Sequence, residues 1–73
     1  MSVREKVGLA RYIDEAIRRA VVECEPDGCT ATVPELRGCI TFGETPEEAI
    51  ENLRDAVEAW VLTAIRFGDP VPA

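Results

Sequence analysis

The segment Gly43-Glu44-Thr45-Pro46-Glu47-Glu48 carries the clearest structural signal in the sequence, the start of a helix. Thr45 is a residue type that accepts hydrogen bonds from the first free N–H groups of a helix, and Glu48, three positions later, completes a capping box. Pro46 fits the first helical position, where its missing N–H is not needed. Glu47 and Glu48 also suit the positive end of the helix dipole. We therefore expect a long helix to begin directly after Thr45.

The sequence downstream of residue 48 has the periodicity of an amphipathic helix. Apolar residues recur every three or four positions along one stripe, and charged residues lie outside it. Gly68 is a typical C-terminal stop, and Pro70 lies just beyond it. We expect the segment 69–72 to be extended and to form an edge strand. The apolar stripe consists of Ala49, Ile50, Leu53, Ala56, Val57, Trp60, Val61, Ala64 and Ile65.

A β-hairpin is expected upstream of this helix. Residues 20–25 mix β-branched residues with alternating charges, and residues 29–33 alternate between small apolar residues and threonine. Both patterns are typical of strands. The turn Pro26-Asp27-Gly28 between them is favourable because Pro presets φ, Asp bonds its own backbone and Gly accepts a positive φ. An antiparallel hairpin places Cys24 opposite Cys29.

Two further elements complete the sequence pattern. Pro34 ends the second strand because it has no N–H for the hydrogen-bond ladder. Residues 35–38 are expected to form a turn that closes at Gly38, and residues 39–42 are expected to form a third strand. At the N-terminus, apolar residues spaced by three and four predict an amphipathic helix over residues 3–19.

These elements predict an α+β fold in two layers. The order is α-β-β-β-α followed by the extended tail, with an antiparallel three-stranded sheet covered by helices. Because each helix has one apolar stripe, we expect both helices to pack on the same face of the sheet. Residues 1–73 are expected to form a single domain. We expect Trp60 to pack on the sheet, the alternative being a place in an interface stripe.

The charge distribution points to a basic partner and away from nucleic acid. Eight Lys and Arg against 14 Asp and Glu give a net charge of −6. Two basic and ten acidic residues give the segment 23–58 a net charge of −8, which disfavours direct binding of nucleic acid and would steer a basic protein. The candidate partner-binding residues flank the hairpin and the turns beside it: Glu23, Glu25, Asp27, Glu35 and Glu44.

The cysteines have more than one interpretation. The chain has three cysteines, Cys24, Cys29 and Cys39, and no apolar run long enough for a membrane span or a signal peptide. We therefore expect a cytoplasmic protein with free thiols. The alternative is a disulfide, because Cys24 and Cys29 come near disulfide reach in a hairpin. A zinc site would need a fourth ligand, and the chain has no His to supply it.

Nothing in the sequence forms a recognisable catalytic or cofactor-binding constellation. Pairs of carboxylates such as Glu23/Glu25 or Glu51/Asp55 could in principle serve a metal-dependent nuclease. They stand at positions expected to face solvent, where nothing shifts their pKa. Ser2 is the only serine, no His can activate it, and the glycines fall singly at turns. We expect no catalytic residues, no bound metal and no cofactor.

The turn and capping motifs occur in an order that resembles the HicB antitoxin-like family. Residues 27–39 read Asp-Gly-Cys-Thr-Ala-Thr-Val-Pro-Glu-Leu-Arg-Gly-Cys and lead into Gly-Glu-Thr-Pro-Glu-Glu-Ala at 43–49. The chain continues through Asn52-Leu53 to Trp60, and Gly-Asp-Pro-Val-Pro follows at 68–72. The resemblance covers about residues 21–72. The helix before the first strand departs from many members of the family.

The resemblance implies a fold, a partner and an activity. The fold would be a partial RNase H-like β-β-β-α-β arrangement without RNase H chemistry. The partner would be a small basic HicA-like toxin, a prokaryotic mRNA interferase, whose active site the antitoxin masks. Full antitoxins of this family also carry a C-terminal DNA-binding domain, so we expect no operator binding by the HicB-like domain alone.

Three functional hypotheses follow. The first is a non-catalytic antitoxin that neutralises a HicA-type toxin, and the second is an orphan homo-oligomeric regulatory or scaffold domain without a toxin. The third is a vestigial metal-dependent nuclease, which would need carboxylates converging in one pocket. A homodimer or higher oligomer is expected under either of the first two, because a 73-residue core is marginal on its own. The edge strand and the first helix are the expected contacts.

Overall fold

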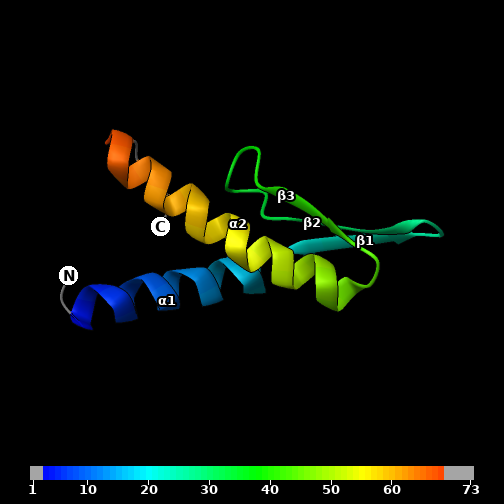
Figure 1. Ribbon diagram of the computed structural model, residues 1–73, viewed down its shortest axis with the longest axis horizontal. Helices are drawn as coiled ribbons and strands as arrows, with labels where there is room; N and C mark the ends of the chain where they lie inside the picture. The colour runs from blue at the N-terminus through cyan, green and yellow to red at the C-terminus, as the bar shows by residue number, and fades with distance from the viewer. Residues whose placement is uncertain (1–2, 69–73) are drawn as a thin grey trace.

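The computed structural model describes the backbone of residues 3–68 and the side chains of residues 8–68 (Figure 1). The described elements are α1 (Val3–Arg18), β1 (Val21–Glu25), β2 (Gly28–Thr32), β3 (Ile40–Gly43) and α2 (Pro46–Phe67). This confirms the predicted α+β class with an antiparallel three-stranded sheet. The expected strand at 69–72 lies outside the described residues, and the RNase H-like relationship stays a prediction.

The three strands form a meander in the order β1-β2-β3, with both pairs antiparallel. Val22, Ala31 and Thr41 align across the sheet, and so do Cys24, Cys29 and Gly43. Side chains alternate between the two faces of a strand. These two rows therefore share one face, on which Cys29 and Ala31 are buried. The opposite face carries the intervening residues of each strand.

The N-terminal half of α2 covers this buried face of the sheet (Figure 1). The Thr41 hydroxyl donates to the Ala49 carbonyl at 2.9 Å, and the Asn52 amide donates to the Phe42 carbonyl at 2.7 Å. At Gly43 the strand runs so close to the helix that a β-carbon would lie 2.8 Å from the backbone carbonyl carbon of Glu48. Glycine is therefore required there for close packing. The buried residues of α2 are Ala49, Leu53, Val57, Val61 and Ala64.

The ends of α2 agree with the predicted N-cap at Thr45 and the predicted stop at Gly68. Thr45 is the N-cap, and its hydroxyl oxygen accepts a hydrogen bond from the Glu48 N–H at 3.1 Å. Pro46 stands in the first turn. At the other end, Gly68 adopts a left-handed conformation with φ of 72°, and its N–H bonds to carbonyls of the last turn. Glycine adopts this conformation without the steric penalty of a side chain.

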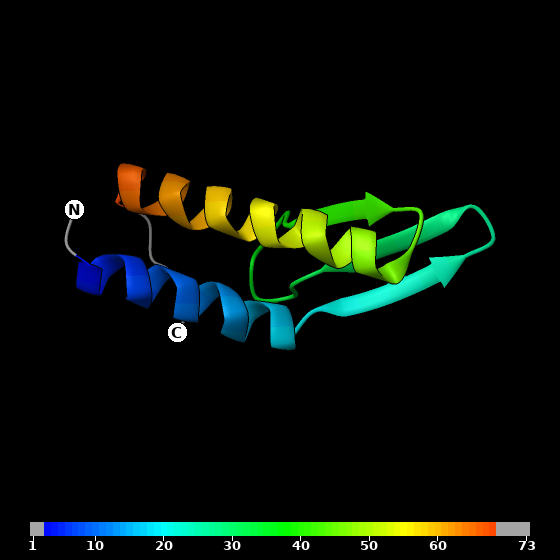
Figure 2. The same cartoon turned by 60° about the horizontal axis from the view of Figure 1, so that its bottom comes forward.

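The first helix packs differently from the expectation that both helices lie on the sheet. In Figure 2, α1 lies along the C-terminal half of α2, beyond the end of the strands, and the molecule is elongated at 43 × 22 × 16 Å. Ile13 and Ala16 are buried in this contact, and Arg54 forms an ion pair with Asp14 at 2.7 Å. Only residues 19 and 20 link α1 to β1, and they do not reverse the chain. β1 therefore continues in the direction of α1, which leaves α1 beyond the end of the sheet (Figure 2).

The connection between β2 and β3, residues 33–39, contributes buried side chains to the core. Leu36 is almost fully buried, and the Cys39 N–H donates to the Leu36 carbonyl at 3.0 Å. Gly38 has a φ of 79°, the left-handed conformation expected for the end of this turn. Trp60 is half-buried against the core, and its Nε1–H donates to the Arg37 carbonyl at 3.1 Å. Trp60 therefore packs on this connection, so it combines core packing with partial exposure.

The cysteines correct the expectation of free thiols. Cys24 and Cys29 are directly opposite in the hairpin, as predicted, with 4.0 Å between their Cα atoms, and they form a disulfide. The expectation had rested on the assumed compartment, whereas the register of the hairpin brings the two sulfur atoms together. Cys39 is free and buried, and burial raises the pKa of its thiol. Within residues 3–68, neither helix is long and apolar enough to cross a membrane.

Candidate binding surface

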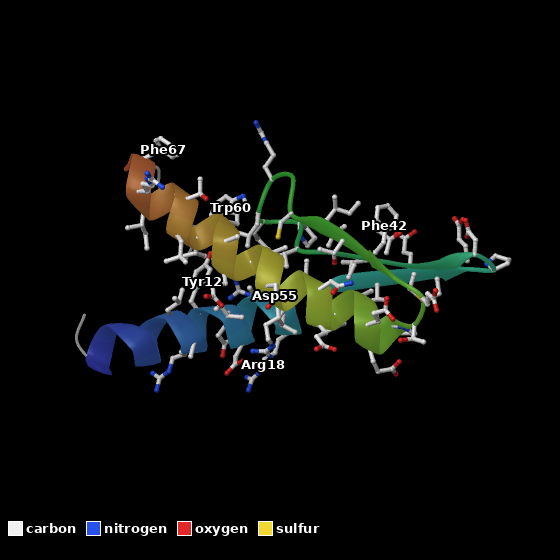
Figure 3. The ribbon with its side chains drawn as sticks, viewed as in Figure 1. Tyr12, Arg18, Phe42, Asp55, Trp60 and Phe67 are labelled. Carbon is white, nitrogen blue, oxygen red and sulfur yellow. A yellow bond between two sulfur atoms is a disulfide. The ribbon has the colours of Figure 1, made fainter. Side chains whose placement is uncertain are left out.

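The face of the sheet that α2 leaves uncovered carries an exposed apolar row. Val21, Thr32 and Ile40 align across the strands, and Glu23, Thr30 and Phe42 align beside them. The apolar row consists of the apolar members of this set, Val21, Ile40 and Phe42. The exposed fraction is 44% for Val21, 53% for Ile40 and 71% for Phe42. Figure 3 shows the Phe42 side chain projecting from β3, away from α2. Large side chains this exposed on a strand indicate a surface that another molecule covers.

Acidic residues border this apolar row. A shallow groove of about 390 Å³ runs over the uncovered sheet, and three of the lining residues are acidic. Glu23 and Glu25 come from β1, and Asp27 comes from the turn that joins β1 to β2. All three carboxylates are exposed. We call this surface the open face, defined by Val21, Glu23, Glu25, Asp27, Thr30, Thr32, Ile40 and Phe42.

The structure brings together only part of the acidic set predicted from the sequence. Glu23, Glu25 and Asp27 share the open face. Glu44 directly follows Gly43, which lines the same groove, and Glu44 is exposed. Glu35 lies elsewhere, because the β2–β3 connection carries it to the side of α1. The open face therefore contains three of the five predicted residues, with a fourth adjacent.

Glu35 belongs to a separate groove of about 280 Å³ between α1 and the β2–β3 connection. Tyr12 also lines this groove, and burial raises the pKa of its phenol. The charge of Arg19 lowers that pKa, and the charge of Glu35 raises it further. The remaining lining residues include Ala16, Val33 and Leu36, which are buried members of the core. This groove marks the edge of the α1 contact and is spatially separate from the open face.

Sequence reasoning missed the apolar half of the open face. The acids stood out through their charge, whereas Ile40 and Phe42 were assigned only to a strand. A usable signal was present, because Ile40 and Phe42 lie two positions apart and so share one side of β3. Whether that side is covered depends on the β2–β3 register, in which Thr30 is opposite Phe42.

The chemistry available at this surface is recognition by charge and apolar contact. In the described part of the chain, no three Cys, Asp or Glu side chains gather closely enough to hold a metal ion. The carboxylates that the sequence pairs, Glu23/Glu25 and Glu51/Asp55, are all exposed. An exposed phenylalanine beside several carboxylates suits a protein surface with an apolar centre and basic flanks.

Comparisons with known proteins agree on one family. A family model described as UPF0150-like matches residues 11–72. "UPF0150 protein ssr1765" of Synechocystis is 42% identical over 53 residues, covering 71% of this chain and 67% of that protein. A "UPF0150 protein" of Helicobacter pylori strain J99 is 40% identical over 42 residues, or 58% of each chain. This chain thus matches somewhat over half the length of the Helicobacter protein.

A solved structure extends the agreement to the fold. The crystal structure of TTHA0281 from Thermus thermophilus is similar with a TM-score of 0.79 and 32% sequence identity. The match covers 88% of this chain and 82% of that one. The arrangement of helices and strands described above is therefore shared with an experimentally determined structure.

Proposed function

The chain belongs to the UPF0150 family, and from that premise we propose that it is a non-catalytic, antitoxin-like binding module of the HicB type. It neutralises a small basic toxin, an mRNA interferase of the HicA type, by covering the toxin's active site. The motifs at residues 27–39 and 43–49 support the HicB type. The observation that carries the proposal is the open face, where exposed Ile40 and Phe42 adjoin Glu23, Glu25 and Asp27.

The charge of the open face suits a ribonuclease as partner. A protein that holds RNA needs basic side chains to neutralise phosphates. Glu23, Glu25 and Asp27 offer carboxylates to those same basic groups, and the apolar row excludes water from the contact. Neutralisation then follows from occlusion, because the toxin's RNA-binding groups are occupied by the antitoxin. No reaction step is required of this chain.

The test uses the protein encoded by the reading frame adjacent to that of this chain, which the proposal expects to be a small basic toxin. We expect co-purification of the two proteins and stoichiometric inhibition of RNA cleavage. The double variant Glu23→Lys/Asp27→Lys should associate at least about tenfold more slowly at low salt and show a weaker salt dependence, because electrostatic steering is removed. The matched control Glu35→Lys/Glu58→Lys changes the net charge equally but lies outside the open face, and it should behave like the wild type.

Two results would contradict the proposal. If both double variants slowed association equally, net charge and not the open face would guide the encounter. If no neighbouring protein bound at all, the second hypothesis, an orphan oligomeric domain, would account better for the exposed apolar side chains.

A further inference from the structure

The outward side of α2 carries a short row of residues with a self-complementary order. Asp55, Ala59, Leu62 and Arg66 follow one another at spacings of four, three and four, so they share one face of the helix. All four are exposed, and Leu62 has an exposed fraction of 46%. We call these four residues the outer row. The outer row lies on the side of α2 that faces away from the sheet, and only Ala59 comes near the open face, since it lines a groove together with Ile40.

We propose that the outer row binds a second copy of this chain, with the two α2 helices antiparallel about a twofold axis near residues 60 and 61. In this arrangement Asp55 of each copy is opposite Arg66 of the partner subunit, and Ala59 is opposite the partner's Leu62. The twofold symmetry repeats both pairs, so four residues supply four matched contacts. A parallel pair of helices would instead place like residues together, Asp55 against Asp55 and Arg66 against Arg66.

The charges of the outer row favour this occupant over an unrelated partner. Among the side chains of residues 8–68, the ion pairs that involve the helices are Arg54 with Asp14 and Arg18 with Glu15. Asp55 and Arg66 form no ion pair with another described side chain. Because Asp55 and Arg66 lie at opposite ends of this helix face, an antiparallel second copy places an opposite charge against each of them.

The sizes of the side chains are complementary in the same way. Ala59 leaves room at its position for the Leu62 side chain of the partner subunit, and small residues let two helices approach closely. Phe67, with an exposed fraction of 71%, follows Arg66 but is turned about 100° around the helix from it, so it lies outside the outer row. Figure 3 shows Asp55 on the middle of α2 and Phe67 near its C-terminal end.

The length of the outer row sets the strength of the dimer. From residue 55 to residue 66 an α-helix rises about 17 Å. A contact of this length belongs to the small, weak class of interfaces, so we expect dissociation constants in the range of about ten to a hundred micromolar. Dimerisation through α2 leaves both open faces free, so it does not depend on the proposed function.

The experiment is sedimentation equilibrium of the purified chain alone, with charge-exchange variants. Asp55→Lys and Arg66→Glu should each weaken the dimer about tenfold, because both symmetric pairs become repulsive. The double variant Asp55→Lys/Arg66→Glu should return to within about threefold of the wild type, and so should an equimolar mixture of the two single variants. Glu35→Lys, which changes charge in the β2–β3 connection away from this face of α2, should leave the dimer unchanged.

Helical circular dichroism of each variant verifies that its fold is intact. Leu62→Ala gives a second measure that does not alter charge, and it should also weaken the dimer. The proposal is wrong if the wild type remains monomeric up to several hundred micromolar. It is equally wrong if a dimer forms that ignores the charge exchange, or one that Phe42→Ala disrupts while Leu62→Ala does not.

Discussion

Replacing Phe42 by alanine removes the largest apolar side chain of the open face. A fully buried aromatic side chain removes about 150–250 Å² from water. Since 71% of Phe42 is exposed in the free chain, a partner can cover roughly 110–180 Å² of it, worth about 3–4 kcal/mol at 25 cal/mol per Å². Alanine retains the β-carbon, so the loss of binding free energy should be about 2–3 kcal/mol. That loss corresponds to a dissociation constant roughly 30- to 150-fold higher.

The assay is isothermal titration of the toxin identified by co-purification with wild type and variant, together with inhibition of RNA cleavage. Folding should be little affected, because Phe42 contributes mainly exposed surface, and the free energy of unfolding should change by less than about 1 kcal/mol. The matched control is Phe67→Ala, since Phe67 is equally exposed at 71% but lies at the end of α2. It should leave toxin binding unchanged.

One outcome would refute the reasoning directly. If Phe42→Ala bound the toxin within about threefold of the wild type while Phe67→Ala bound poorly, the contact would involve the end of α2. The open face would then need another explanation. If both variants bound normally, apolar contact would contribute little and the acidic residues alone would carry recognition.

Three further predictions concern stability. Gly43→Ala should lower the free energy of unfolding by about 2–3 kcal/mol, because the added β-carbon meets the backbone of α2. Gly8→Ala, which has open space around the added β-carbon, should raise the free energy of unfolding by about 0.5–1 kcal/mol. Thermal melting of both variants checks this prediction, and equal shifts of the two would contradict it. A reductant should destabilise the wild type by about 2 kcal/mol through loss of the Cys24–Cys29 disulfide and leave Cys24→Ala unaffected, measured by urea titration. Burial raises the pKa of Cys39 above its ordinary value of 9.0, so the protonated thiol contributes stability that is fully present below pH 9.0 and is lost as pH rises through the folded-state pKa. Urea titrations from pH 8 to 11 should show the free energy of unfolding falling over this range. Cys39→Ala should make that fall with pH less steep.

The elements that could be predicted from the sequence are those with local causes. Thr45 and Gly68 fix the ends of α2 through hydrogen bonds within one turn of the helix, so their residue types suffice. The hairpin is local as well, and the predicted pairing of Cys24 with Cys29 is confirmed. The disulfide itself was only the alternative, since the assumed compartment favoured free thiols over the bond that the hairpin geometry allowed.

The features that escaped prediction depend on tertiary arrangement. The apolar stripe of α1 predicts burial but does not say against what, and in the structure it packs against α2 and not against the sheet. The binding surface was half predicted for a similar reason. Charge identified Glu23, Glu25 and Asp27 directly, whereas the exposure of Phe42 depends on which sheet face α2 covers. Glu35 was grouped with the other acids by sequence proximity, and the β2–β3 connection separates it from them.

The placement of Trp60 gives the molecule an internal fluorescent reporter. It is the only tryptophan in the chain, and its indole N–H is bonded to the Arg37 carbonyl of the β2–β3 connection. Loosening of that connection exposes the indole to water and shifts its emission to longer wavelength. Trp60 lines a groove with Ile40 but lies away from Phe42 (Figure 3), so a ligand that covers Phe42 and the acidic residues leaves the emission wavelength largely unchanged. A single spectrum can therefore distinguish opening of the core from occupation of the sheet, without any attached dye.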